Sequence, residues 1–187
     1  MITLIANIDR GITAFLYNFF PHNQFFDYIF SFFSFYGSSI IIWFIAALLL
    51  VIFAEKKNKK FIIYLAVALL ITLFLTNVVF KNVFHRVRPV QTPNTSISCP
   101  KDFSFPSGHA SAAFAGAVVL AVFDKKRKYF YYGTAILIAY SRIYLGCHYF
   151  LDVLGGSIVG SIVAYLTLRF GQIFLDCFRG CTTKNSS

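Results

Sequence analysis

Long stretches without a charged residue constrain this chain more than any other feature. Residues 28–54 and 61–80 contain no aspartate, glutamate, lysine or arginine. Three further apolar stretches follow at 107–123, 129–147 and 153–175, and the last two each contain one arginine. A helix needs about 20 apolar residues to cross the hydrocarbon core of a bilayer. The sequence therefore predicts about five membrane-spanning helices.

Composition supports a membrane protein built as one helical domain. Of the 187 residues, 58% are hydrophobic and only 13% are charged, a balance that is unusual for a soluble domain. The apolar stretches lack the alternation of a transmembrane β-barrel, so helices are the expected spanning elements. We therefore expect residues 1–187 to form a single all-α domain, a polytopic bundle of membrane helices.

The first 27 residues predict an amphipathic helix rather than a cleaved signal peptide. Asp9 and Arg10 interrupt the early apolar run, and no small-residue cleavage motif follows it. Apolar side chains recur at helical spacing: Ile5, Ile8, Ile12, Phe15, Leu16, Phe19 and Phe20. Such a helix is expected to lie in the membrane interface. Two roles stay open for it, a surface anchor and a gate for lipids.

Basic residues cluster in the connections between the predicted spans. The chain carries 17 lysines and arginines against 7 acidic residues, and basic runs fill residues 55–60 and 125–128. They do not form a surface interleaved with aromatic residues, so no nucleic-acid partner is expected. Basic connections stay on the cytoplasmic side of a membrane. With five spans, the connections 81–106 and 147–152 then share the extracytoplasmic face of a plasma membrane, as in the bacterial inner membrane.

Three short polar strings stand at the ends of the apolar stretches. They are residues 81–89 (KNVFHRVRP), 106–109 (PSGH) and 141–152 (SRIYLGCHYFLD). Ionisable groups at membrane depth are costly, and they persist where they face one another or a wet cavity. We therefore expect the three strings to converge at the outer face.

The strings contain the groups that phosphate transfer requires. The guanidinium groups of Arg88 and Arg142 can each hold two phosphate oxygens, and Lys81 adds a compact charge. The Pro-Ser-Gly sequence before His109 favours a helix start, whose backbone N–H groups are suited to bind an anion.

His148 and Asp152 are four residues apart, a spacing that places two side chains on one face of a helix. The carboxylate would then accept a hydrogen bond from one imidazole nitrogen and leave the other nitrogen as a nucleophile. We expect His148 to face solvent, with His109 available as a proton donor. A helix-surface hydrogen bond without chemistry is the alternative when the pair is considered by itself.

The four cysteines lack the spacing of a metal site, so no metal is predicted. Cys99 and Cys147 both fall on the predicted outer face, where a disulfide is chemically permitted, and two free thiols are the alternative. Cys177 and Cys181 follow at the cytoplasmic end of the last span, either as free thiols or as a site of lipidation.

Together the strings resemble the signature of the type 2 phosphatidic acid phosphatase family, which reads Lys-x6-Arg-Pro, Pro-Ser-Gly-His and Ser-Arg-x5-His-x3-Asp. Residues 81–152 fill every position of it. The resemblance implies a helical membrane enzyme that removes phosphate from a lipid without a metal or other cofactor. It implies these phosphate-binding groups: Lys81, Arg88, Ser107, the amide of Gly108, and Arg142. His148 would attack phosphorus, Asp152 would orient His148, and His109 would protonate the leaving oxygen.

Several alternatives stay open at this point. The signature recognises phosphate and not the lipid tail, so undecaprenyl diphosphate, phosphatidic acid, phosphatidylglycerophosphate and lipid A phosphates are all candidate substrates beside the surrounding membrane lipids. The oligomeric state is not specified. A haloperoxidase would use similar residues to hold vanadate, but five spans argue against it. A non-catalytic lipid-phosphate binding protein or transporter would need the cations but not His148, His109 and Asp152.

Overall fold

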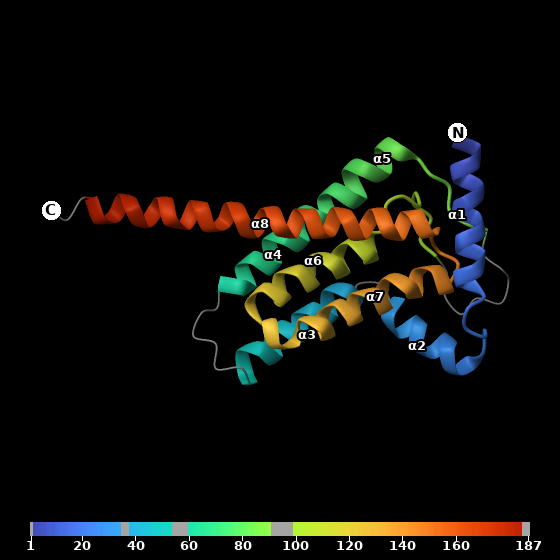
Figure 1. Ribbon diagram of the computed structural model, residues 1–187, viewed down its shortest axis with the longest axis horizontal. Coiled ribbons are helices and arrows are strands. Elements are labelled where there is room, and N and C mark those ends of the chain that lie inside the picture. The colour runs from blue at the N-terminus through green and yellow to red at the C-terminus, as the bar shows by residue number, and fades with distance from the viewer. Residues whose placement is uncertain (1, 35–37, 54–59, 91–98, 185–187) are drawn as a thin grey trace.

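The computed structural model describes residues 2–34, 38–53, 60–90 and 99–184 (Figure 1). Its elements, in chain order, are α1 (Ile2–Tyr17), α2 (Gln24–Ser34), α3 (Ser38–Phe53), α4 (Lys60–Phe74), the π-helical segment η1 (Leu75–Phe80), α5 (Lys81–Phe84), α6 (Gly108–Phe123), the 3-10 turn η2 (Lys125–Arg127), α7 (Lys128–Tyr144) and α8 (Phe150–Lys184). No strand occurs within the described ranges. The predicted all-α fold class is confirmed for that part of the chain.

Two helices have the length and composition of a membrane span. α4, η1 and α5 continue one another from Lys60 to Phe84 over 25 residues, and the Phe150–Gly171 part of α8 has 22 residues. The apolar helices Ile40–Leu50 and Gly108–Phe123 are shorter. Two spans are therefore supported within the described residues, and the count of about five stays a prediction.

The apolar stretch 28–54 does not form one helix. α2 ends at Ser34 and α3 begins at Ser38, and Figure 1 shows the two helices running in different directions. The sequence did not reveal the division because every residue on both sides of it is uncharged. Of the two helices in this stretch, α3 is the one that lies beside α6 at the centre of the bundle.

α1 confirms that the N-terminal segment is helical. Ile5 and Ile8 are about half exposed, at 51% and 53%, whereas Asp9 is only 1% exposed. In Figure 1, α1 lies at the end of the bundle where α8 begins. The exposed apolar face fits the predicted interfacial location, which stays a prediction.

α6 is the central helix of the bundle. It contacts α3, α4, α7 and α8, and most of its residues are buried. Alanine and glycine predominate along it, so the neighbouring helices approach closely. Larger side chains from those neighbours, among them Trp43, Phe61 and Tyr131, fill the space around it. The outward side chains of the surrounding helices are mostly large and apolar, as contact with lipid requires.

Two glycines on α8 set its distance from α6. Gly156 lies against the backbone of Ser107, and Gly160 lies against the carbonyl oxygen of Ser111. A β-carbon at either position would overlap these backbone atoms, which move only with the whole helix. The close contact brings the starts of α6 and α8 together, so the second and third polar strings meet there.

A disulfide joins Cys99 and Cys147, whose Cα atoms are 5.4 Å apart. It connects the segment before α6 to the turn between α7 and α8, across a sequence separation of 48 residues. Of the two states that the sequence left open, the structure therefore has the disulfide. The side chains of Cys177 and Cys181 lie outside the described part of the structure.

Gly160→Ala is expected to destabilise the protein, because the added methyl group pushes α8 away from Ser111. Overpacking of this kind costs about 1–3 kcal/mol. Gly133→Ala on α7 is the matched control, since no atom beyond its chain neighbours and the adjacent backbone of its own helix lies within 4 Å of the position of its β-carbon. Alanine there is expected to leave stability unchanged or to raise it by up to about 1 kcal/mol. Fluorescence of Trp43 during thermal unfolding in detergent measures both effects. An unchanged or higher midpoint for Gly160→Ala would contradict the close helix contact.

Candidate active site

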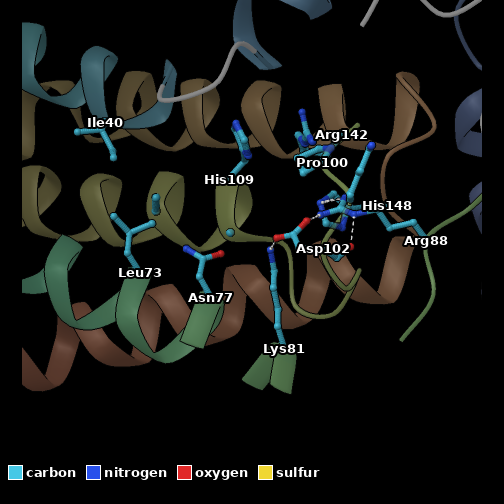
Figure 2. A pocket seen from close by; sticks show the side chains of 13 residues that line it. Ile40, Leu73, Asn77, Lys81, Arg88, Pro100, Asp102, His109, Arg142 and His148 are labelled. Carbon is cyan, nitrogen blue, oxygen red and sulfur yellow. Dashed lines mark hydrogen bonds and ion pairs between the residues drawn. The ribbon is translucent and has the colours of Figure 1, made fainter. Parts of the chain in front are cut away.

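The three polar strings meet around one cavity of about 470 Å³ (Figure 2). Six of the eight residues predicted for the site line it: Lys81, Arg88, Gly108, His109, Arg142 and His148. The other two, Ser107 and Asp152, are fully buried and lie behind its wall. Ile40, Leu73 and Ala112 form an apolar part of the lining.

Lys81 and Arg88 share one carboxylate. The ammonium group of Lys81 donates to Oδ2 of Asp102. Nη2 of Arg88 donates to Oδ1 of Asp102 at 2.6 Å, and Nε donates to the Asp102 backbone oxygen at 2.8 Å. Burial raises the pKa of the Asp102 carboxyl, but hydrogen bonds and charges from Lys81 and Arg88 outweigh it and hold this pKa below its ordinary value. Asp102 is therefore ionised at neutral pH and forms ion pairs with two of the cations, of whose combined charge it offsets one unit.

Arg142 is held by the end of α2. Its side chain is buried on the last turn of α7, and Nη1 donates to the backbone oxygen of Ser34 at 3.2 Å and to the Ser34 hydroxyl. Nε and Nη2 have no hydrogen-bond partner among the described groups. Unpaired buried donors on a charged group are costly, so these two atoms are well suited to bind the oxygens of an anion.

His148 lies in the turn before α8, not on that helix. The expectation that it shares a helix face with Asp152 is wrong, because α8 begins at Phe150. The expected solvent-facing imidazole is also wrong, since the residue is 1% exposed. The turn folds back on α7 because the N–H groups of Cys147 and His148 both donate to the Arg142 carbonyl oxygen, at 3.0 and 3.2 Å.

The imidazole of His148 presents Nε2 to the cavity. Nη1 of Arg88 lies 3.0 Å from Nε2, and a guanidinium can only donate, so Nε2 is the unprotonated nitrogen. The proton is then on Nδ1, which is 3.6 Å from Oδ2 of Asp152. This distance is too long for a hydrogen bond, and Nδ1 has no partner among the described residues. A closer approach by about half an ångström would form the bond.

Burial lowers the pKa of His148 well below its ordinary value of 6.5, and the charges of Arg142, Arg88 and Lys81 lower it further. The imidazole is therefore neutral at neutral pH. A neutral ring with an unprotonated Nε2 is the form of histidine that can act as a nucleophile.

The second string forms the start of α6. The Ser107 hydroxyl accepts from the N–H of Ala110 at 3.5 Å, and the Ser107 N–H donates to the backbone oxygen of Asp152 at 2.9 Å. Ser107 thus caps α6 and ties it to α8. Gly108 and His109 follow at the cavity wall, where the first N–H groups of a helix have no intrahelical acceptor and can bind an anion.

Sequence reasoning did not single out Asp102, Ser104 or Arg86. Asp102 is the one acidic residue between positions 81 and 106, and that was the available signal. Ser104 donates to Oδ2 of Asp152, and Nη1 of Arg86 donates to Oδ1 at 2.7 Å. Arg86 belongs to the first string but occupies a position that the family signature leaves unspecified.

A bundle of apolar helices with buried cations around a neutral imidazole defines a membrane protein that handles phosphate. Residues 61–175, more than half of the chain, match the family model described as the PAP2 superfamily. The chain therefore belongs to the PAP2 superfamily, and the resemblance that the three strings indicated is confirmed.

Individual relatives agree with this membership. An undecaprenyl-diphosphatase of Sulfolobus acidocaldarius is 34% identical over 142 residues, which are 74% of this chain and 67% of that protein. The undecaprenyl-diphosphatase BcrC of Bacillus subtilis is 29% identical over 154 residues, 81% of this chain and 78% of that protein. A solved transmembrane PAP2-type phosphatidylglycerolphosphate phosphatase of Bacillus subtilis has a TM-score of 0.68 and 27% identity, covering 90% of this chain and 87% of that one.

Nitrogen NMR of the labelled protein in detergent is expected to show a neutral His148 ring at pH 6.5. Because burial lowers the pKa in the folded state, the unfolded chain takes up this proton first as pH falls. The stability contributed by the neutral ring is then complete above about pH 6.5 and declines below it. A spectrum of His148→Gln identifies the signal. Protonation of that ring at or above pH 6.5 would contradict the buried, cation-lined site.

Proposed function

We propose that this protein removes phosphate from a membrane lipid by transferring it first to His148 and then to water. One observation carries the proposal: the unprotonated Nε2 of His148 faces a cavity that is lined by Lys81, Arg88 and Arg142. The cations attract the phosphate and stabilise the charge on its oxygens in the transition state. Membership of the PAP2 superfamily makes the chain a lipid phosphate phosphatase, and it is an integral membrane protein.

The reaction has two displacement steps. In the first, Nε2 of His148 attacks the terminal phosphorus while the bond from that phosphorus to the leaving oxygen breaks, and His109 donates a proton to that oxygen. The leaving oxygen is that of the lipid alcohol in a monoester and the bridging oxygen in a diphosphate. In the second, water attacks the phosphohistidine, His109 accepts a proton from the water, and the phosphorus–nitrogen bond breaks to release phosphate. Figure 2 places His109 and His148 on the wall of the same cavity. Asp152 would accept from Nδ1 as positive charge develops on the ring of His148.

The lining of the cavity supports a lipid substrate. Ile40, Leu73 and Ala112 lie at the same cavity as the cations, so a molecule with a charged head and an apolar body fits both parts. Undecaprenyl diphosphate is the first choice together with phosphatidic acid or phosphatidylglycerophosphate. A binding protein or transporter would use the cations, but it would have no use for a neutral histidine with an unprotonated Nε2 beside a buried carboxylate.

We further propose that the site faces away from the cytoplasm of a bacterial-type inner membrane. The basic run 125–128 joins the end of α6 to the start of α7. The second and third polar strings lie at the opposite ends of these two helices, and the first string lines the same cavity. A disulfide beside the site fits an oxidising compartment, because cytosolic disulfides are rare. The count of about five spans is consistent with this orientation.

His148→Gln is expected to lower phosphate release by roughly 10³-fold or more, because the amide cannot form the covalent intermediate. Glutamine is used because it keeps much of the volume of a buried ring. His22→Gln is the matched control, since His22 is an exposed imidazole in the turn after α1. Farnesyl diphosphate and dioctanoyl phosphatidic acid in detergent, with a chelator present, serve as substrates, and inorganic phosphate is measured. A folded His148→Gln protein with wild-type turnover would refute the mechanism.

Thiol labelling tests the orientation. Cys177 and Cys181 are replaced by serine while the Cys99–Cys147 disulfide is kept, and one cysteine is then added at Val90 or at Lys126. Val90 is 97% exposed near the site, and Lys126 is exposed at the opposite end of the bundle. An impermeant maleimide added to intact spheroplasts is expected to label Val90→Cys, and Lys126→Cys only after lysis. The reverse pattern would place the site in the cytoplasm.

A further inference from the structure

Arg86 joins two buried carboxylates close to the cavity. Its Nη1 donates to Oδ1 of Asp152 at 2.7 Å, and its Nη2 donates to Oδ2 of Asp9. Both acidic side chains are 0% exposed, whereas that of Arg86 is 27% exposed. The guanidinium also lies over the ring of Tyr149, 4.3 Å from its centroid. These contacts hold the planar group in one orientation between the two acids.

Asp9 belongs to α1, yet it also reaches the start of α8. Its Oδ1 accepts from the N–H of Leu151 at 2.9 Å, and the hydroxyl of Thr13 accepts from the N–H of Phe150 at 2.9 Å. Two side chains of α1 therefore cap the first turn of α8, a task that residues just before a helix usually perform. Figure 1 shows α1 beside this end of α8.

The orientation of the Asp152 carboxylate decides whether it can bind His148. Oδ2 accepts from the Ser104 hydroxyl and from the N–H of Tyr149, and it lies 3.6 Å from Nδ1 of His148. Oδ1 is held by Arg86. Without Arg86 only Oδ2 would be held, and the carboxylate could rotate about its Cβ–Cγ bond. Oδ2 would then no longer be kept in line with Nδ1 of His148, which has to come about half an ångström closer to form the hydrogen bond.

We propose that Arg86 and Asp9 are positioning residues for the phosphate transfer. Asp9 fixes Arg86, Arg86 fixes and charge-balances Asp152, and Asp152 orients the ring of His148. This inference rests on the proposed function, because His148 is the nucleophile named there. Neither Arg86 nor Asp9 lines the cavity, so they act on the reaction step and not on substrate binding. The inference makes α1 a part of the active site.

Three single variants test the chain of contacts. Arg86→Gln is expected to lower kcat about 10- to 100-fold with KM changed by less than about threefold, as for groups that orient a reacting side chain. Arg86→Lys keeps the charge but cannot bridge both acids, so it recovers part of the lost kcat. Asp9→Asn keeps the size of the side chain, and we expect a smaller loss of kcat, again with KM nearly unchanged. Arg10→Gln, at an exposed position of α1, is the matched control and retains wild-type kcat.

The double variant separates positioning from general destabilisation. If Asp9 acts through Arg86, then Asp9→Asn in the Arg86→Gln background lowers kcat by less than about twofold more, since effects of coupled residues do not add. Independent structural damage would instead multiply the two losses and lower the thermal midpoint in parallel. Size-exclusion chromatography and thermal unfolding in detergent accompany each assay with dioctanoyl phosphatidic acid.

The outcomes distinguish failure of this inference from failure of the proposed function. Full turnover in His148→Gln would remove the proposed function. An inactive His148→Gln together with wild-type kcat in Arg86→Gln and Asp9→Asn would overturn the positioning role alone. A rise in KM at constant kcat, or multiplied losses in the double variant, would overturn it as well. If Arg86→Gln does not fold, Asp9→Asn provides the test. A lower kcat at constant KM supports the positioning role, and a wild-type kcat overturns it.

Discussion

The contacts of Asp152 hold the three polar strings together. Its backbone oxygen accepts from Ser107 at the start of α6, and its carboxylate binds Arg86 of the first string and Ser104. Removal of one partner from a buried ion pair costs about 3–5 kcal/mol, because the other charge is left uncompensated. The start of α8 can therefore shift only with the start of α6 and with the segment after α5. His148 precedes α8 and shifts with them.

The cations of the cavity have partners that a phosphate can replace. Arg142 binds a neutral hydroxyl and a carbonyl oxygen of Ser34, while Lys81 and Arg88 share the half-exposed carboxylate of Asp102. A phosphate carries more charge and more acceptor oxygens than either partner, and guanidinium groups bind it with two parallel hydrogen bonds. Burial lowers the pKa of His148, and the same cations lower it further. In the proposed function, the cations that attract the substrate therefore also help to keep the imidazole of His148 neutral.

Much of the candidate site could be predicted because its charged residues are unusual next to long apolar stretches. Charges at the ends of apolar stretches identified Lys81, Arg88 and Arg142, and counting spans between basic connections predicted that the strings converge. Local spacing was a poorer guide. The four-residue separation of His148 and Asp152 indicated one helix, but the backbone turns at Gly146, whose φ is 67°, and α8 begins only after His148. Ser107 likewise lies behind the cavity wall because the close approach of Gly156 buries it.

The sequence by itself determined the helical membrane class, the candidate site residues and the family, because each depends on residue identity, on short spacings or on the cost of placing charge in an apolar segment. Only the tertiary structure decided which acid balances which cation. Arg86 and Asp9 are 77 positions apart, and Arg86 and Asp152 are 66 apart. Such pairs form only when helix packing brings distant segments together, here through the glycine contacts between α6 and α8 and the cap that α1 places on α8. Local patterns do not predict these pairs, because an arginine such as Arg86 could equally be exposed and have its charge solvated by water.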